Sequence, residues 1–548
     1  MSAEFSYSNR KILIVDDQRA FQIMLKSMLQ NFGANQIHFA HTAEQALSVC
    51  KKTAYDLILV DYNLGSGQNG AQLLEELRAT NSILPATLCF IITGENHKAL
   101  VLNALEVEPD DFITKPFSQN QLNQRIKRAA LKRDTLLPIH IAFAEQQYQR
   151  AIDCCQQFIT QNSRYKGICQ SLAIEAMIHL KKYQQARKLL LSQLSKAAQT
   201  RAKATLARVE YLLGNHQRAI ELSTEVIINN PFTLSAYDSL SLAFWDNGEV
   251  NKALKTIRRA NELCPLSISR QQIMAELALE SGNFRLAKEA FGQILKLARC
   301  SVHRGPEHLC NFIRSLIDEA QHEDDLYRKN RLLQEVGNVL FKARHEEGQD
   351  KAFDFNAFEG LSQARVLATK GEIRQAKRVL FSSNQNYIQK PKLVSNVLLT
   401  DTFLTLHSVG EYEYAMPMIE ELKSRQNDIN HLAYKVANKV YQSQEFSSEI
   451  ATFKELNQRG IEAHNHGDYR QAYQLFAKAL RLAPGNTGVI LNRIQSILKY
   501  LATSDQRSIQ EFEECKIGLQ SLEGIQLSPS HSDRLKALKD EFEIIVRS

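Results

Sequence analysis

The chain has 548 residues and a mass of 62.3 kDa, which is too long for one hydrophobic core and predicts two or more structural units. Residues 1–134 contain 14 Lys and Arg and 14 Asp and Glu, so the net charge of +7 arises entirely in the rest of the chain. This weak bias lacks the clustered basic stripe of a nucleic-acid-binding protein. No stretch is as long as a membrane span, and residues 1–6 do not resemble a signal peptide, so a cytoplasmic location is expected.

Four short apolar runs predict buried parallel strands, because they are apolar without alternation: 11–15, 57–60, 88–92 and 112–114. Polar side chains follow directly after these runs. They are Asp16 and Asp17, Asp61, Thr93 and Lys115. Because open α/β sheets bind ligands at the carboxyl ends of their strands, we expect these five side chains to converge at one edge.

The converging residue types suit phosphoryl transfer. Three carboxylates form a hard oxygen site for Mg²⁺, and a metal-bound carboxylate is a workable nucleophile toward phosphorus. Lys115 supplies a point charge, and Thr93 supplies a hydroxyl that can follow the phosphoryl oxygens. Taken singly, each residue is more often a turn or strand-end residue. Their conjunction in one strand context carries the inference.

Together these residues resemble the receiver domain of two-component response regulators. The matching features are the acidic pair after the first strand, Asp61 after the third, Thr93 in Ile-Ile-Thr-Gly and Lys115-Pro116 after the fifth. The resemblance covers roughly the first quarter of the chain and implies a flavodoxin-like domain over residues 8–133, with a five-stranded parallel sheet of order 2-1-3-4-5. It also implies that Asp61 accepts a phosphoryl group from a sensor histidine kinase or a histidine phosphotransfer protein.

The resemblance further assigns Mg²⁺ to Asp16, Asp17, Asp61 and the backbone carbonyl of Asn63. It implies a cis peptide at Lys115-Pro116, and it places Phe112 at the aromatic switch position, where Thr93 acts as its partner.

The sequence departs from the family pattern at two places. No proline stands four positions after Asp61, and the usual glycine comes one position later, at Gly70. This predicts a longer and more flexible loop beside the acceptor. The switch position carries Phe112 instead of the common tyrosine, so its movement would rely on packing with no hydroxyl to anchor it.

Asn63 and Glu95 form a polar pair also seen in single-domain chemotaxis response regulators. We therefore expect comparatively fast self-dephosphorylation. Acceptance and hydrolysis of the aspartyl phosphate are the only reactions expected, because the rest of the chain lacks a phosphate loop, a nucleophile elbow or a zinc-protease motif.

From about residue 138 onward, a helical repeat replaces the strand signals. A glycine is followed five positions later by an alanine in the pairs Gly214 and Ala219, Gly248 and Ala253, Gly282 and Ala287, and Gly467 and Ala472. The first three glycines are 34 residues apart. Weaker copies are Tyr148 with Ala151, Tyr183 with Ala186, Gly371 with Ala376 and Gly410 with Ala415. The pattern resembles tetratricopeptide (TPR) repeats, although ordinary helical hairpins are the alternative.

The repeats predict TPR-like segments over 138–299, best in 200–299, and over 355–503, best in 453–486. An irregular helical connection over 300–354 separates them, and C-terminal helices follow over 504–548. The family resemblance implies a superhelical solenoid whose concave groove binds a protein or peptide. A helix over 118–133 and a break at Pro138 are expected to join the two parts.

The favoured hypothesis is a response regulator whose phosphorylation controls which protein its helical scaffold binds. An alternative is a phosphate sink that drains a kinase, with the repeats only docking it there. A nucleic-acid-binding effector is less favoured, and an independent enzyme least.

Overall fold

The computed structural model describes residues 5–65, 67–94, 98–194, 199–299, 301–347, 353–425, 431–504 and 509–547. The chain forms two compact units, Met1–Arg304 and Gly305–Ser548. Within the described ranges, no helix is both long enough and apolar enough to cross a membrane.

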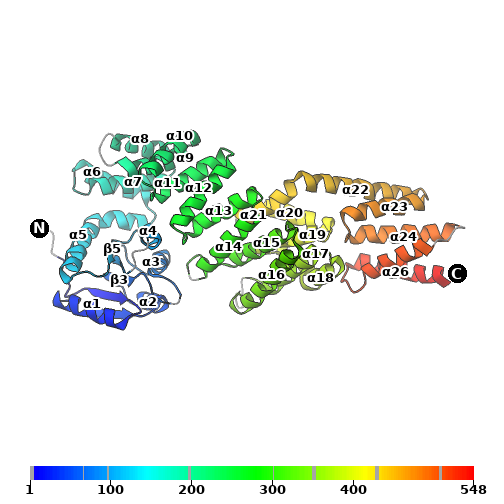
Figure 1. Ribbon diagram of the computed structural model, residues 1–548, viewed down its shortest axis with the longest axis horizontal. Helices are drawn as coiled ribbons and strands as arrows, with labels where there is room; N and C mark the ends of the chain where they lie inside the picture. Colours follow the sequence, from blue (N-terminus) through cyan, green and yellow to red (C-terminus); the bar gives the residue numbers. More distant parts are fainter. Residues whose placement is uncertain are drawn as a thin grey trace. The chain divides into compact units, whose positions relative to one another are not determined.

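The first unit begins with a parallel sheet in the order β2-β1-β3-β4-β5, which confirms the predicted topology. Strands β3 and β5 are labelled among helices α1 to α5 in Figure 1. Together with its helices it forms the α/β domain, which ends within α5. The strands are β1 Lys11–Val15, β2 Gln36–Ala40, β3 Leu57–Asp61, β4 Leu88–Thr93 and β5 Asp111–Thr114. The helices are α1 Arg19–Asn31, α2 Ala43–Cys50, α3 Gly70–Ala79, α4 Lys98–Glu106 and α5 Gln119–Ala144.

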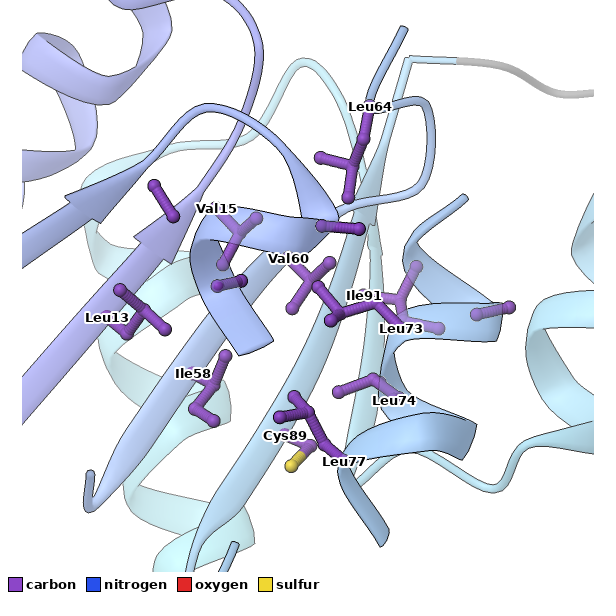
Figure 2. Packing of buried hydrophobic residues seen from close by; sticks show 14 of the residues in the cluster. Leu13, Val15, Ile58, Val60, Leu64, Leu73, Leu74, Leu77, Cys89 and Ile91 are labelled. Atoms are coloured by element: carbon purple, nitrogen blue, oxygen red, sulfur yellow. The ribbon is translucent and has the colours of Figure 1, made fainter. Parts of the chain in front are cut away.

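Alternate residues of the central strands pack into two apolar clusters, one on each face of the sheet. Leu13, Ile58 and Cys89 pack with Leu74 and Leu77 of α3 on one face (Figure 2). The residues between them in each strand pack against α1 and α5 on the other face. Helices therefore cover both faces, and the central strands are buried along their length. The carboxyl edge of the sheet is left for polar side chains.

Helix α5 runs through Pro138 to Ala144, so the predicted break at Pro138 is wrong. Leu122 and Ile126 belong to the core of the α/β domain, whereas Leu136 and Ile139 pack with the next helix of the chain. A proline inside a helix costs about 3 kcal/mol, and apolar packing on both sides of Pro138 outweighs this penalty. One helix thus belongs to two cores.

The rest of the first unit is a series of helical hairpins, the first helical array. Its helices are α6 Tyr148–Thr160, α7 Lys166–His179, α8 Tyr183–Gln193, α9 Gln199–Leu212, α10 His216–Asn229, α11 Leu234–Asp246, α12 Val250–Leu263, α13 Ile268–Glu280 and α14 Phe284–Ala298.

Successive hairpins share one turn. Gly214, Gly248 and Gly282 have φ between 74° and 81°, the left-handed region that glycine tolerates best. After each glycine, the next backbone N–H donates to the carbonyl five residues before it. The alanine five positions after each glycine is fully buried. Gln146 and Lys181 occupy the same turn position without being glycine, at φ 57° and 56°.

The second unit is also helical among its described residues. Residues 300–354, predicted as an irregular helical connection, contain the whole of α15 and of the longer α16. The helices of this unit are α15 Pro306–Gln321, α16 Leu326–Glu347, α17 Phe355–Thr369, α18 Ile373–Gln389, α19 Asn396–Ser408, α20 Tyr412–Ser424, α21 His431–Gln442, α22 Gln444–Asn465, α23 Tyr469–Leu482, α24 Thr487–Thr503, α25 Ile509–Ser521 and α26 Pro529–Arg547, with a 3₁₀ turn η1 at Pro391–Leu393.

Buried ion pairs cross between hairpins of the second unit. Lys377 Nζ lies 2.5 Å from Glu411 Oε1 and 2.6 Å from Thr487 Oγ1, and both ionic side chains are 2% exposed. Arg314 forms a second buried pair with Asp401, at 2.6 Å. Removing one partner of such a pair would leave an uncompensated buried charge, so these contacts fix which helices pack together.

Candidate functional site

The register of the sheet brings the predicted polar residues level at one edge. Val15 pairs with Val60, so Asp16 and Asp61 follow neighbouring positions of β1 and β3. Asp61 pairs with Ile92, which places Thr93 one step further along β4. Thr93 pairs with Thr114, and Lys115 follows directly. Residues distant in the sequence therefore meet because parallel strands end together.

Lys115 lies between two carboxylates. Its Nζ is 3.1 Å from Asp16 Oδ2 and 3.2 Å from Asp61 Oδ1. The ammonium also lies 3.6 Å from the ring centre of Phe21 of α1, in cation–π geometry. The Lys115-Pro116 peptide is cis, as the family resemblance implies. Asp16 is 1% exposed and Asp61 6%, so the cation is paired with carboxylates that are almost fully buried.

Asp16, Asp17 and Asp61 form an acidic cluster in which one oxygen of each residue lies within 4.8 Å of the others. Burial raises the pKa of Asp61 to about 6; Lys115 opposes this rise, and Asp16 and Asp17 add to it. Three carboxylates with one ammonium leave an excess of negative charge. The donor set is made only of hard oxygens, so these residues fit a Mg²⁺ ion.

Gly70 supports the backbone of the acceptor strand. A Cβ at this position would overlap the carbonyl oxygen of Asp61, and the Gly70 N–H donates to the carbonyl of Tyr62 at 2.8 Å. Asn69 caps α3 by accepting from the backbone N–H of Gln72. The loop after β3 therefore returns to β3 at a position that requires glycine. The close approach of the Asp61 carbonyl is therefore the physical reason why position 70 is a glycine in this chain.

The remaining predicted residues are placed as follows. Thr93 is 3% exposed at the end of β4, and Phe112 of β5 is partly buried against the apolar cluster of Figure 2. Asn63 is exposed, and its side chain accepts from the Gly65 N–H at 3.2 Å. Glu95 lies outside the described residues, so the predicted pair of Asn63 and Glu95 stays a prediction.

Sequence reasoning missed the residues that hold the acidic cluster in place. Gln22 Nε2 donates to the carbonyls of Asp16, at 2.7 Å, and Ala40, at 3.0 Å, which ties the ends of β1 and β2 together. The Gln18 N–H donates to Asp16 Oδ1 at 2.8 Å. A polar residue in the buried stripe of α1, with Leu25 and Leu29, is the signal that could have identified Gln22.

Comparison with known proteins separates the first part of the chain from the rest. Residues 12–127 match the family model described as the response regulator receiver domain. The chemotaxis protein CheY-3 of Vibrio cholerae is 30% identical over 122 residues, which cover 22% of this chain and 91% of CheY-3. The chain belongs to the response regulator receiver family. Its α/β domain is the receiver domain, homologous to the regulators of two-component systems.

Other relatives match the receiver domain alone. The transcriptional regulatory protein YvrH of Bacillus subtilis is 38% identical over 125 residues, which cover 23% of this chain and 50% of YvrH. CpxR of Escherichia coli is 37% identical over 123 residues, 22% of this chain and 50% of CpxR. The chain thus spans about half the length of these transcriptional regulators.

A solved receiver structure is also similar. The CheY-like receiver domain protein of Methanospirillum hungatei is 26% identical, with a TM-score of 0.21, and the match covers 23% of this chain and 96% of that structure.

Proposed function

We propose that Asp61 accepts a phosphoryl group from the phosphohistidine of a sensor histidine kinase or a histidine phosphotransfer protein. The observation that carries this proposal is the bridging position of Lys115, whose ammonium lies within 3.2 Å of both Asp16 and Asp61. Such a cation can neutralise charge on a phosphoryl oxygen. Membership of the receiver family supports the same chemistry.

In this mechanism an Asp61 carboxylate oxygen attacks phosphorus as the P–N bond to the imidazole breaks, and the imidazole leaves with the bonding electron pair. Mg²⁺, when held by Asp16, Asp17, Asp61 and the Asn63 carbonyl, supplies charge neutralisation. Lys115 pairs with one phosphoryl oxygen, and the Thr93 hydroxyl donates to another. Water then hydrolyses the acyl phosphate. We expect no other reaction from the chain.

The helical hairpins of both units act in this proposal as TPR-type scaffolds for a protein or peptide partner. The recurring glycine turn and the buried alanine after it support the assignment. The first array also has a hollow of about 790 Å³, lined in part by Lys166, Glu175, Arg201 and Arg208. A hollow with charged side chains of both signs suits an extended peptide with polar groups. Phosphorylation of Asp61 would control this binding.

The acceptor is tested with acetyl phosphate and Mg²⁺, read by a phosphate-affinity gel and the mass of the intact chain. Wild type should gain one phosphoryl group, Asp61→Asn should gain none, and chelation of Mg²⁺ should prevent the reaction. Asp56→Asn is the matched control, because Asp56 precedes the opposite end of β3 and pairs with Arg10. Equal modification of wild type and Asp61→Asn would exclude Asp61 as the acceptor.

The lifetime of the phosphorylated chain tests the expected role of Asn63 and Glu95. We expect hydrolysis within minutes in Mg²⁺ buffer, and Asn63→Ala should change the rate. A phosphorylated form that persists for many hours would contradict rapid self-dephosphorylation.

The output is tested by capturing partners from a cell lysate with phosphorylated wild type and with Asp61→Asn. A partner retained by only one form would support switched binding and show its direction. Phosphorylation that leaves every interaction unchanged would favour the phosphate sink.

A further inference from the structure

Helix α4 of the receiver domain contacts the first helical array at both of its ends. Lys98 Nζ lies 5.0 Å from the ring centre of Phe232, just before α11. At the other end, Glu106 accepts hydrogen bonds from Arg270 Nη1, at 3.0 Å, and Arg270 Nη2. The thiol of Cys264 lies 3.5 Å from the same carboxylate. The contact at the Glu106 end is therefore a bidentate guanidinium–carboxylate pair, which is stronger than the cation–π contact at the Lys98 end.

Arg270 is shared between the receiver domain and the array. It lies in the first turn of α13, and only 6% of its side chain is exposed. Its Nε and Nη2 also donate to Asp238 of α11, at 2.7 and 2.9 Å. If Glu106 moves away, Asp238 still pairs with the guanidinium, so no buried cation is left alone. The contact with Glu106 can therefore open while the array stays intact.

The surroundings of Arg270 also favour a separable contact. A cavity of about 500 Å³ lies between the receiver domain and α13, and its wall includes the polar side chains of Gln72, Asn103, Ser267 and Gln272. An interface with such a cavity is not a continuous apolar core. A few polar side chains therefore hold the receiver domain on the array, and Arg270 is more buried than the four polar residues of the cavity wall.

A short chain of contacts links the acceptor to Glu106. Tyr62 follows Asp61 directly, is 4% exposed, and donates its hydroxyl to Asn103 Oδ1 of α4 at 3.0 Å. Asn103 and Glu106 are three residues apart in α4, so they lie on one side of the helix. A change at Asp61 that moved Tyr62 would therefore act on the end of α4 that Arg270 binds.

We propose that Arg270 is a latch that holds α4 on the array while Asp61 is unmodified, and that phosphorylation of Asp61 releases Glu106 from it. The latch rests on the proposed function of Asp61 as phosphoacceptor. When it opens, α4 and the first turn of α13 become accessible together. Coupling between two sites is reciprocal, so a latch that favours the unmodified receiver also opposes its phosphorylation.

Hydrogen exchange of the full chain, with and without acetyl phosphate and Mg²⁺, tests the latch. In wild type the donor should speed exchange in α4 and the first turn of α13 about tenfold. Glu106→Gln should show this faster exchange without the donor, and it should be phosphorylated faster than wild type. Glu108→Gln is the matched control, because Glu108 is 80% exposed and only 3.9 Å from the exposed Arg201. It should behave as wild type.

The outcomes separate the latch from the proposed function. If Asp61 is phosphorylated but exchange in α4 and α13 is unchanged, the latch is wrong and the acceptor stands. If Glu106→Gln matches Glu108→Gln in both exchange and phosphorylation rate, the latch is also wrong. If no donor phosphorylates Asp61, the proposed function fails and the latch fails with it.

Discussion

The receiver domain and the first helical array of the same unit are built in contrasting ways. In the receiver site, Asp16, Asp61 and Lys115 come from the ends of different strands. Each of these positions occurs once in the sheet, so no second residue stands at an equivalent place. The array repeats one turn, with a residue at positive φ and a buried alanine five positions later. The contrast teaches that a site assembled from distant residues depends on single positions, whereas a repeated turn spreads its stability over equivalent ones.

The largest stability effect is expected at Gly70, where a side chain would meet the backbone of the acceptor strand. Gly70→Ala should destabilise the receiver domain by about 3 kcal/mol, because the new Cβ overlaps the Asp61 carbonyl oxygen, which cannot rotate away. The free energy of opening is measured by hydrogen exchange of the β3 and β4 amides.

Gly94→Ala is the control for Gly70→Ala on the same edge of the sheet. Its Cβ would meet only Lys115 Cδ, at 3.9 Å, which is an ordinary contact. The control should change the opening free energy by less than about 0.5 kcal/mol. Equal effects of the two substitutions would show that the return of the loop to β3 does not depend on Gly70.

A smaller effect of opposite sign is expected at Asp61 in the absence of metal. Burial raises the pKa of Asp61 from 3.8 to about 6, so the folded state binds this proton more tightly than the unfolded state does. The group therefore destabilises the fold as pH rises from about 4 to 6, and the full penalty remains at pH 7. Asp61→Asn should stabilise the metal-free receiver by about 2 kcal/mol at pH 7.

Thermal unfolding across this pH range, with EDTA and with Mg²⁺, measures the effect at Asp61. Mg²⁺ should stabilise wild type more than Asp61→Asn, because the variant lacks one of the three carboxylates. A variant less stable than wild type in EDTA would mean that the pairing with Lys115 outweighs the burial and repulsion of the Asp61 carboxylate.

Within the array, Gly248→Ala should cost about 1 kcal/mol, measured by hydrogen exchange of α11 and α12. The glycine has φ 78°, where an L residue is strained, although the space around its Cβ is open. Gly167→Ala, in helix α7 where a Cβ also meets nothing, should instead be neutral or stabilising. If Gly248→Ala lost as much stability as is expected for Gly70→Ala, the distinction between the receiver domain and the array would not hold.

These differences also explain how much the sequence could predict. Four apolar runs with a polar residue after each were enough to predict four parallel strands and the meeting of Asp16, Asp61 and Lys115, whereas the fifth strand and the strand order came from the family resemblance. Gln22 and Gly70 were not assigned roles, because their partners are backbone carbonyls that come close only in the folded sheet. The course of α5 through Pro138 depends on packing on both sides of the proline, which local helix rules do not include.

The smallest effect is expected at Lys181, which takes the turn position of the glycines with φ 56°. The N–H of the next residue donates to the Met177 carbonyl at 2.8 Å, as in the glycine turns, and Ala186 is buried five positions later. Lys181→Gly should therefore stabilise the α7–α8 hairpin by about 0.5 kcal/mol, by removing the strain of a Cβ at positive φ.

Lys181→Ala removes the same charged side chain but keeps the Cβ, so it should bring no gain. Hydrogen exchange of α7 and α8 distinguishes the two substitutions. A gain for Lys181→Gly alone would show that the turn is one structural unit whichever residue occupies it, and equal effects of both would show that glycine is not what this turn requires.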